Sequence, residues 1–541
     1  MKSDLTLREL FPAMGALLLA AALPFLAAWA LTPPGMVFLG ALLNPDDASV
    51  YLAAMRQGGA GAWLYRFQFS PEPIPPRLTY LPYLLLGRAA AQFGGAPLLW
   101  LHGARLASGA LALLALWFWV RQVWPGRARV QLTAWRLIAV GGGLGWLAAI
   151  LARPDLKRLP DLTLAEWGVL LPLLGMPHFA LGLALELLLF GCLLRAANGW
   201  RWAALAALCG ALLGLVYPFN LAVVGPVVGL WALATGVAWR RIPWRLWARI
   251  GLVLLPLLPF VGYYVLWARR DPYWAQAQFS DNLVPAPAPQ WLAMGLGLVG
   301  VWALAGGWAA VLGKARGWAP DSARLVGVWA LANLLLLYVP LPFAGRFVLG
   351  LAVPLGTLAA AGLETAVLPW LTRRPAFSVF SRLTPTPHAS LRRVLLLLTL
   401  PSPLMAALIL AYSPLVRPDF PLYLPEAELR AVAWLAEHAS ADSVVLAHYP
   451  VGNVLPRAAA GRVFLGQPYL TLDLPAKLAL LDQFWDPATP DAWRADFVRA
   501  WGVSHVYAGR YEQALGADAV TPPGRVIYRA NGVTIWAAAD E

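Results

Sequence analysis

Hydrophobic residues occur along most of this chain in long runs that short polar segments separate. A helix of about 20 apolar residues crosses the roughly 30 Å hydrocarbon core of a bilayer, so each run predicts a membrane span. The pattern places these spans at 11–33, 98–120, 137–151, 168–194, 202–219, 221–239, 250–268, 291–312, 325–340, 343–363 and 393–412. Segment 78–95, which carries Arg88, is either a short span or a helix lying at the interface.

The expected number of spans is odd, eleven in the simplest interpretation. If 78–95 also spans, another segment such as 168–194 has to split at Pro172 or Pro177, which raises the total to as many as 13. The predicted fold class is therefore a polytopic all-α transmembrane bundle over residues 1–424, in which 44–77 forms the first outer loop.

The pattern changes after about residue 424, where acidic residues reach ordinary density and short alternating segments begin. Such segments predict strands and amphipathic helices of a soluble α/β domain over 425–541. Helices are expected at 425–438, 475–485 and 490–501, and strands at 443–447, 462–466, 503–508, 526–529 and 533–537. Ala530-Asn531-Gly532 joins the last two strands as a hairpin.

Composition and charge agree with a membrane protein. Hydrophobic residues make up 60% of the chain and charged residues only 13%, against about 25% in soluble proteins. The net charge of +14 forms no single basic patch, so nucleic acid is not an expected partner.

The basic residues instead lie at the ends of the apolar runs, and they fix the expected orientation. With a cytoplasmic N-terminus the inner segments hold 20 Lys and Arg and the outer ones 8, as the positive-inside rule expects. Segments 44–77, 152–166 and 269–290 then face outward, as do residues 425–541.

Two further features have simple explanations. Cys192 and Cys209 both lie inside apolar runs, so neither a disulfide framework nor a cysteine-based metal site is expected. The first apolar run resembles a signal peptide with a site at Ala28-Trp29-Ala30, but it is about twice as long as a signal-peptide core. We interpret it as an uncleaved first span.

The first outer loop carries the most distinctive chemistry, because Asp46 and Asp47 follow the first span directly. One interpretation is a helix N-cap in front of Ala48–Gln57. The other is a general base at the membrane surface that removes a proton from an acceptor hydroxyl. On a helix beginning here Tyr51 shares a face with Asp47, so its ring is expected to flank that carboxylate.

The order of these features resembles the GT-C superfamily of glycosyltransferases, which use polyprenyl-phosphate sugars. The resemblance is greatest to uncharacterised bacterial members of the protein-mannosyltransferase and aminoarabinose-transferase branch. It rests on Asp46-Asp47, Tyr51-Leu52, Met55-Arg56-Gln57, Trp63-Leu64, Arg66, Glu72, Pro75-Pro76-Arg77-Leu78, Pro177-His178-Phe179-Ala180-Leu181, Tyr217-Pro218-Phe219-Asn220 and Gly345-Arg346-Phe347.

The resemblance implies that the outer-loop aspartate is the base, a role that falls on Asp47 with Asp46 second. Some relatives carry a lysine before the Pro-Pro pair, whereas Ile74 stands here and Arg77 is the nearest cation. Relatives also often carry a later acidic residue, for which Asp155, Asp161 and Glu166 remain open.

Several other side chains are candidates for the donor site. A lipid-phosphate leaving group needs cations, which Arg66, Arg77 and Arg346 provide, although arginines at such places also snorkel to lipid headgroups. His178 and Asn220 are expected to bind substrate or, equally, to be hydrogen-bonded helix residues. No metal site is predicted apart from a possible divalent cation at Asp46 and Asp47.

The sequence thus predicts a glycosyltransferase in the bacterial cytoplasmic membrane. It would move a hexosyl or pentosyl group from a polyprenyl-phosphate donor to a glycan, lipid or protein acceptor on the outer face. The alternatives are a non-enzymatic translocase of a lipid carrier or polymer, and an assembly subunit in which the acidic pair is only a cap.

Overall fold

The computed structural model describes residues 4–240, 242–276, 283–313 and 318–538. Contacts along the chain group it into two compact units. The helical unit comprises Met1–Pro24, His102–Leu266 and Leu283–Ala411. The mixed unit comprises Phe25–Leu101, Trp267–Asn282 and Tyr412–Glu541.

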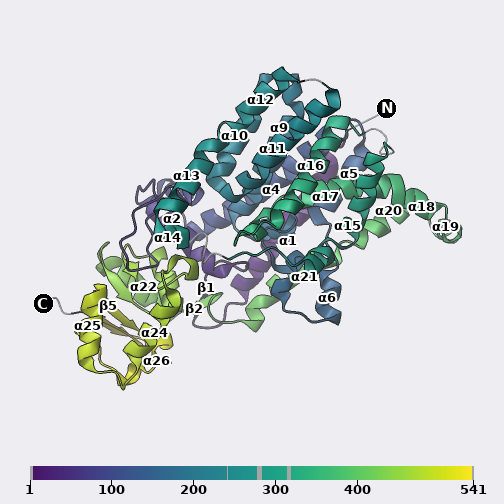
Figure 1. The fold of residues 1–541 in the computed structure, drawn as a ribbon. Coiled ribbons are helices and arrows are strands. Elements are labelled where there is room, and N and C mark those ends of the chain that lie inside the picture. Colours follow the sequence, from purple (N-terminus) through teal and green to yellow (C-terminus); the bar gives the residue numbers. More distant parts are fainter. Residues whose placement is uncertain (1–3, 241, 277–282, 314–317, 539–541) are drawn as a thin grey trace. The chain divides into compact units, whose positions relative to one another are not determined.

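Helices make up most of the helical unit and a large part of the mixed unit (Figure 1). Up to residue 275 they are α1 (Leu7–Ala30), α2 (Ala48–Gly59), α3 (Leu81–Phe93), α4 (Pro97–Val123), α5 (Ala128–Val140), α6 (Gly145–Leu151), α7 (Pro160–Thr163), α8 (Leu170–Leu174), α9 (Pro177–Arg195), α10 (Trp200–Val216), α11 (Leu221–Trp239), α12 (Trp244–Leu254), α13 (Leu257–Arg270) and α14 (Pro272–Ala275). They continue with α15 (Pro289–Val311), α16 (Pro320–Leu337), α17 (Ala352–Gly362), α18 (Leu368–Thr372), α19 (Pro375–Ser381), α20 (Pro387–Leu397), α21 (Pro401–Val416), α22 (Glu426–His438), α23 (Tyr449–Val454), α24 (Leu474–Trp485), α25 (Asp491–Trp501) and α26 (Arg510–Gln513).

The chain is a multi-pass membrane protein. In the described residues seven helices are long and apolar enough to span a membrane: Leu7–Ala30, Pro97–Val123, Ala128–Leu151, Pro177–Asn198, Pro218–Trp239, Pro289–Val311 and Ala344–Thr372. Two bent pairs, α12 with α13 at 42° and α20 with α21 at 41°, raise the number to as many as nine. The predicted polytopic helical bundle is confirmed, with fewer clear spans than the 11–13 expected.

The difference in number has a physical explanation. The expected span 202–219 corresponds to α10, which has only 17 residues because Pro218 ends it. The expected span 325–340 corresponds to α16, which begins near Asp321 and carries Arg324 and Asn333. The ambiguous segment 78–95 contains α3, whose 13 residues extend about 20 Å and do not cross a bilayer.

Small residues let the helices of the helical unit pack closely, as they do in many membrane bundles. A Cβ atom on Gly306 of α15 would lie 1.9 Å from the carbonyl oxygen of Leu358 in α17. A Cβ atom on Gly362 would lie 2.0 Å from the carbonyl oxygen of Trp302. Only glycine fits at this crossing, so the two backbones are in direct contact.

The mixed unit contains the predicted α/β region. A five-stranded sheet has the order β4-β3-β5-β7-β6. Its strands are β3 (Val444–Leu446), β4 (Arg462–Val463), β5 (His505–Ala508), β6 (Arg525–Ala530) and β7 (Val533–Ala537). Strand β3 is parallel to β4 and β5, whereas β7 is antiparallel to β5 and β6. The sheet lies among α22, α24, α25 and α26 in Figure 1.

Alternating strand residues build a core on each face of this sheet. Val444, Leu446 and Val506 pack with Phe484 of α24 and Phe497 of α25. Val445, Tyr507 and Ile535 pack on the other face, with Val432 and Leu435 of α22. The predicted strand and helix pattern of 425–541 is therefore confirmed.

The first outer loop folds together with this region. Strand β1 (Met36–Phe38) pairs antiparallel with β2 (Tyr423–Pro425). The Gln68 carbonyl accepts a hydrogen bond of 2.9 Å from Val463 N beside β4. The Gln68 amide donates at 2.6 Å to the carbonyls of Ala460 and Gly461. A separate domain boundary at 424/425 stays a prediction.

Candidate functional site

The acidic pair lies in a short 3₁₀ turn, Pro45–Asp47, at the start of α2. Asn44 enters this turn in the left-handed region with φ 51°, a conformation that asparagine tolerates better than most residues. Asp47 is the N-cap residue of α2, but its side chain makes no capping hydrogen bond within the described residues. The cap interpretation therefore does not account for its carboxylate.

Side chains from the C-terminal region bind both aspartates instead. Tyr449 donates from its hydroxyl to Asp46 Oδ1 at 2.6 Å, and Gln467 Nε2 donates to Asp47 Oδ1 at 2.9 Å. Asn453 Nδ2 donates to the Asp46 carbonyl at 3.3 Å. Burial raises the pKa of the Tyr449 phenol, and the Asp46 carboxylate raises it further. The phenol therefore stays protonated and serves as a donor.

An arginine supports the same turn. Arg457 donates to Ser49 Oγ at 3.0 Å and to the Leu39 carbonyl at 2.8 Å. Burial lowers the pKa of Arg457 to about 10, while the Asp46 charge acts in the opposite direction. The guanidinium remains charged at neutral pH and adds positive potential near the acidic pair.

Sequence reasoning missed these C-terminal partners of the acidic pair. Tyr449, Asn453 and Arg457 follow one another at i, i+4 and i+8 through α23 and the turn Leu455–Arg457. That spacing places them on one helix face, which is a signal that the sequence carried. Their target was not predictable, because about 400 residues separate them from the aspartates.

Two other candidates of the first loop, Tyr51 and Arg66, contact residues away from the acidic pair. The Tyr51 ring stacks on Tyr83, with centroids 4.3 Å apart, and meets Tyr80 edge-on at 5.8 Å. Arg66 forms an exposed ion pair with Asp442 at 3.4 Å.

Arg77 is held by another segment of the mixed unit. It forms a largely buried ion pair of 2.7 Å with Asp271, and its guanidinium lies 3.9 Å from the Trp267 ring centroid. Arg77 therefore anchors the segment that begins at Trp267.

A second polar cluster lies in the helical unit. Arg346, in the turn Ala344–Val348, contacts Glu166 Oε1 at 3.3 Å, and Tyr217 donates its hydroxyl to the same oxygen at 3.1 Å. The Arg346 guanidinium also lies 4.8 Å from the Phe219 ring, and the His178 ring is nearly parallel to that of Tyr217 at 6.0 Å. The structure thus brings together two predicted candidates, Arg346 and His178.

Glu166 is the later acidic residue that this geometry favours. Its side chain is 3% exposed, and burial raises its pKa while Arg346 lowers it. Asp161 is also buried, but it accepts a hydrogen bond from Gly145 N at 3.0 Å at the start of α6. Asp155 caps a short turn through Lys157 N at 3.0 Å. Both have local structural roles.

Asn220 lies in a different contact of the helical unit. Its side chain is fully buried and donates to Glu186 Oε2 at 2.9 Å. A substrate role for Asn220 stays a prediction.

A small apolar pocket lies beside the second cluster. Trp167, which follows Glu166, and Val348, two residues after Arg346, both line it. The remaining lining residues come from helices of the same unit and the segments beside them: Leu137, Gly141, Gly168, Gly295, Leu296, Val299, Leu351, Ala352 and Leu355.

The acidic pair was also expected as a possible site for a divalent cation. Within the described ranges no three His, Cys, Asp or Glu side chains form a group that could hold a metal ion. Asp46 and Asp47 supply two carboxylates, and each already accepts a hydrogen bond from an organic donor. Mg²⁺ is often held by one or two carboxylates together with water and substrate phosphate oxygens, so a divalent cation at the pair stays a prediction.

Comparison with known proteins gives a clear result for the fold. No protein-family model and no curated protein matches the sequence. The structure is similar to the Archaeoglobus fulgidus oligosaccharyltransferase in its apo form, with a TM-score of 0.53 and 13% identity over 93% of this chain and 71% of that one. It is also similar to ArnT from Cupriavidus metallidurans bound to undecaprenyl phosphate, with a TM-score of 0.52 and 15% identity over 98% of this chain and 100% of that one. The chain has the GT-C fold.

This fold is the one that the resemblance implied. A third similar structure is the Archaeoglobus oligosaccharyltransferase in complex with Zn and sulfate, with a TM-score of 0.52 and 13% identity over 91% of this chain and 68% of that one. At these identities the likeness extends to the fold. The roles of individual residues rest on their own geometry.

Proposed function

We propose that this protein transfers a sugar from a polyprenyl-phosphate donor to an acceptor hydroxyl on the outer face of a bacterial cytoplasmic membrane. The observation that carries the proposal is the acidic pair at the start of α2, whose two carboxylates accept hydrogen bonds from Tyr449 and Gln467. A solvated helix cap would not need buried partners from a distant part of the chain. The GT-C fold, shared with ArnT bound to undecaprenyl phosphate, supplies the substrate class by analogy.

Asp47 acts as the general base in this mechanism. Its carboxylate takes the proton of the acceptor hydroxyl as the acceptor oxygen attacks the anomeric carbon. The bond between that carbon and the phosphate oxygen breaks, and the polyprenyl phosphate leaves with the electron pair. The configuration at the anomeric carbon inverts because one displacement occurs. Asp46, bound by Tyr449, fixes the turn that presents Asp47.

Cations are needed where the phosphate leaves, since negative charge develops on its oxygens. Arg346 is a candidate within the helical unit, where its guanidinium is largely buried and contacts Glu166. Tyr217 steadies Glu166 through its hydroxyl. Arg77 and Arg66, each paired with an aspartate, are weaker candidates for the same role.

The lipid part of the donor requires an apolar surface. The small pocket lined by Trp167, Val348 and Leu351 is apolar and begins next to Glu166 and Arg346 in the sequence. We expect it to contact part of the isoprenoid chain. We expect His178, whose ring is nearly parallel to that of Tyr217, to contact the donor near this cluster.

The test is sugar transfer by purified protein and its Asp47→Asn variant. The donors are undecaprenyl-phosphate hexoses and pentoses, and the products are separated by mass. Loss of a general base lowers the rate about 10²- to 10⁴-fold. Asp496→Asn is the matched control, because its carboxylate lies on the surface beside Arg499 of α25.

Three results would count against the proposal, each in a different way. If Asp47→Asn keeps the full rate, Asp47 is not the base. A wild-type protein that binds undecaprenyl phosphate but transfers none of these sugars favours the translocase. If it binds no undecaprenyl phosphate either, an assembly role is favoured.

A further inference from the structure

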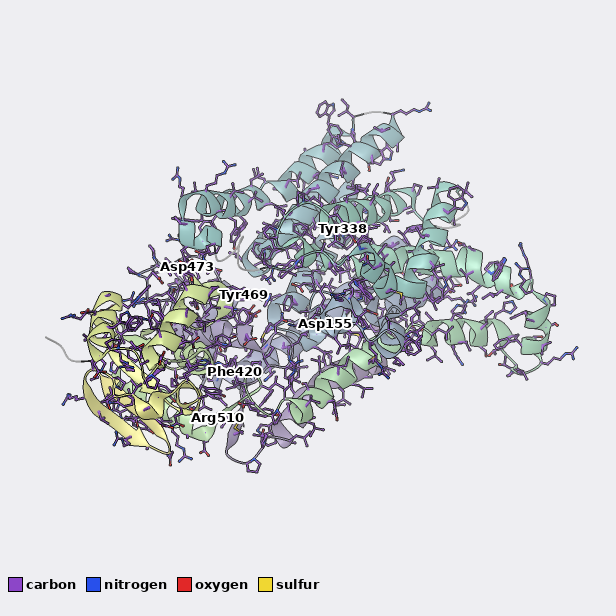
Figure 2. The ribbon with its side chains drawn as sticks, turned by 60° about the horizontal axis from the view of Figure 1, so that its bottom comes forward. Asp155, Tyr338, Phe420, Tyr469, Asp473 and Arg510 are labelled. Atoms are coloured by element: carbon purple, nitrogen blue, oxygen red, sulfur yellow. The ribbon has the colours of Figure 1, made fainter. Side chains whose placement is uncertain are left out.

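The side chain of Gln467 is oriented by the chain around it. It is 1% exposed, and its Oε1 accepts hydrogen bonds from Tyr469 N at 2.8 Å and Leu470 N at 3.1 Å. These bonds cap the turn Pro468–Leu470, which contains Tyr469, labelled in Figure 2. Because Oε1 faces two N–H groups, Nε2 has to point the other way, toward Asp47. The Gln467 atom that lies 2.9 Å from Asp47 Oδ1 is therefore the Nε2 donor, because Oε1 is used by the cap.

The turn that carries Gln467 is itself anchored on two sides. Thr471 Oγ1 donates to the Phe69 carbonyl in the first outer loop at 2.8 Å and accepts from Gly466 N at 2.9 Å. Tyr273 of α14 donates to the Leu470 carbonyl at 2.9 Å. These contacts leave the amide of Gln467 little freedom to turn away from the carboxylate.

The two aspartates consequently have different partners. Asp46 accepts a short bond from the Tyr449 phenol and lies near the Arg457 charge. Asp47 accepts from the neutral amide of Gln467. A donor to the charged form of a carboxylate favours ionisation, whereas an adjacent negative charge opposes it. Because the Asp46 charge opposes ionisation of Asp47, the hydrogen bond from the Gln467 amide is needed to offset it.

We propose that Gln467 is a positioning residue that orients the Asp47 carboxylate and donates to its charged form, while Tyr449 holds Asp46 as an anchor of the turn. This division of roles rests on the proposed function. Among the charged and titratable groups near the pair, Tyr449 donates to Asp46, Tyr469 lies near Tyr449, and the Asp46 charge acts on Arg457.

Gln467→Glu is the decisive variant. A glutamate still accepts from Tyr469 N and Leu470 N, so the cap and the turn survive. It cannot donate to Asp47, and it places a negative charge beside that carboxylate. The charge of the new glutamate at such a distance makes ionisation of the Asp47 carboxyl group harder, by an amount equivalent to about one pH unit or more. Gln513→Glu is the matched control, because its amide donates to the Gly532 carbonyl at an exposed site.

The measurement is the modification of Asp47 in the full chain by a carbodiimide, which reacts with protonated carboxyl groups. Peptide mass spectrometry follows the extent of reaction from pH 4 to pH 9. In Gln467→Glu the midpoint for Asp47 is expected to rise by about one pH unit or more, and in Gln513→Glu it is expected not to move. Where a donor sugar has been found, Gln467→Glu should lower kcat with little change in KM.

The two proposals fail separately in this design. An unchanged Asp47 midpoint in Gln467→Glu, with an unchanged thermal midpoint of unfolding, overturns the role of Gln467 whatever the enzyme does. The role of Gln467 is also overturned if carbodiimide labelling of Asp47 in the wild-type protein does not change with pH. Full activity of Asp47→Asn overturns the base assignment, and it leaves the labelling result untouched.

Discussion

The carboxyl group of Glu512 makes the stability of the C-terminal sheet region depend on pH. Glu512 lies in α26 with no exposed surface, and its oxygens accept from His448 N and from Gly509 N, the latter at 2.9 Å. Burial raises its pKa from 4.5 to about 7, with a contribution from Glu428, while the two backbone bonds lower it. His448 directly precedes Tyr449, so this site borders the donor to Asp46.

The direction in which stability changes with pH follows from proton linkage. Between pH 4.5 and about 7 the folded protein keeps the proton that the unfolded chain releases, so stability falls as pH rises through this window. Above about pH 7 the effect levels off. A shift of about 2.5 units corresponds to about 3 kcal/mol at 1.36 kcal/mol per unit. The full contribution is present below the unfolded pKa and is lost above the folded one.

Hydrogen exchange measured by mass spectrometry tests this expectation on the whole protein. After correction for intrinsic exchange, protection of β5 and β7 should fall about 100-fold between pH 5 and pH 8. In Glu512→Gln, which cannot ionise, this fall should disappear. Glu437→Gln, at an exposed position of α22, should behave like the wild type. An equal fall in the wild type and in Glu512→Gln would refute the reasoning.

Two further predictions concern the helical unit. Glu166→Gln removes the carboxylate partner of a largely buried arginine and should destabilise the protein by about 3–5 kcal/mol, seen as a lower thermal midpoint in detergent. The double variant Arg346→Met, Glu166→Leu should recover part of that loss. If the effects of the two substitutions on the thermal midpoint were strictly additive, the two side chains would not be coupled as an ion pair. Gly306→Ala should cost about 1–3 kcal/mol because its Cβ meets the Leu358 carbonyl. Gly307→Ala, with open space around it, is the control, and equal midpoints for the two variants would contradict the close packing.

The local structure of the C-terminal region was predictable to within a few residues. The expected helices 475–485 and 490–501 are α24 and α25, and the hairpin at Ala530-Asn531-Gly532 joins β6 and β7. Those elements follow from short-range patterns of burial and turn chemistry. The number of spans was less predictable, because Pro218 shortens α10 and polar residues interrupt α16.

The candidate site was predictable only in part. Adjacent carboxylates after a span singled out Asp46 and Asp47. Tyr51, expected to flank Asp47, stacks on Tyr83, and its role beside the carboxylate stays a prediction. The sequence did not indicate that Tyr449 and Gln467 donate hydrogen bonds to these carboxylates. Glu166 could not be separated from its neighbours until the structure placed it against Arg346.

By itself the sequence determined which segments are apolar helices, which residues carry charge, and where the acidic pair stands. These are properties of neighbouring residues, governed by hydrophobic periodicity and the cost of burying charge in lipid. Only the tertiary structure decided which donors meet each carboxylate and which acid meets Arg346. Such pairings depend on burial of groups far apart in the chain, since a buried polar group must find a partner wherever the fold supplies one.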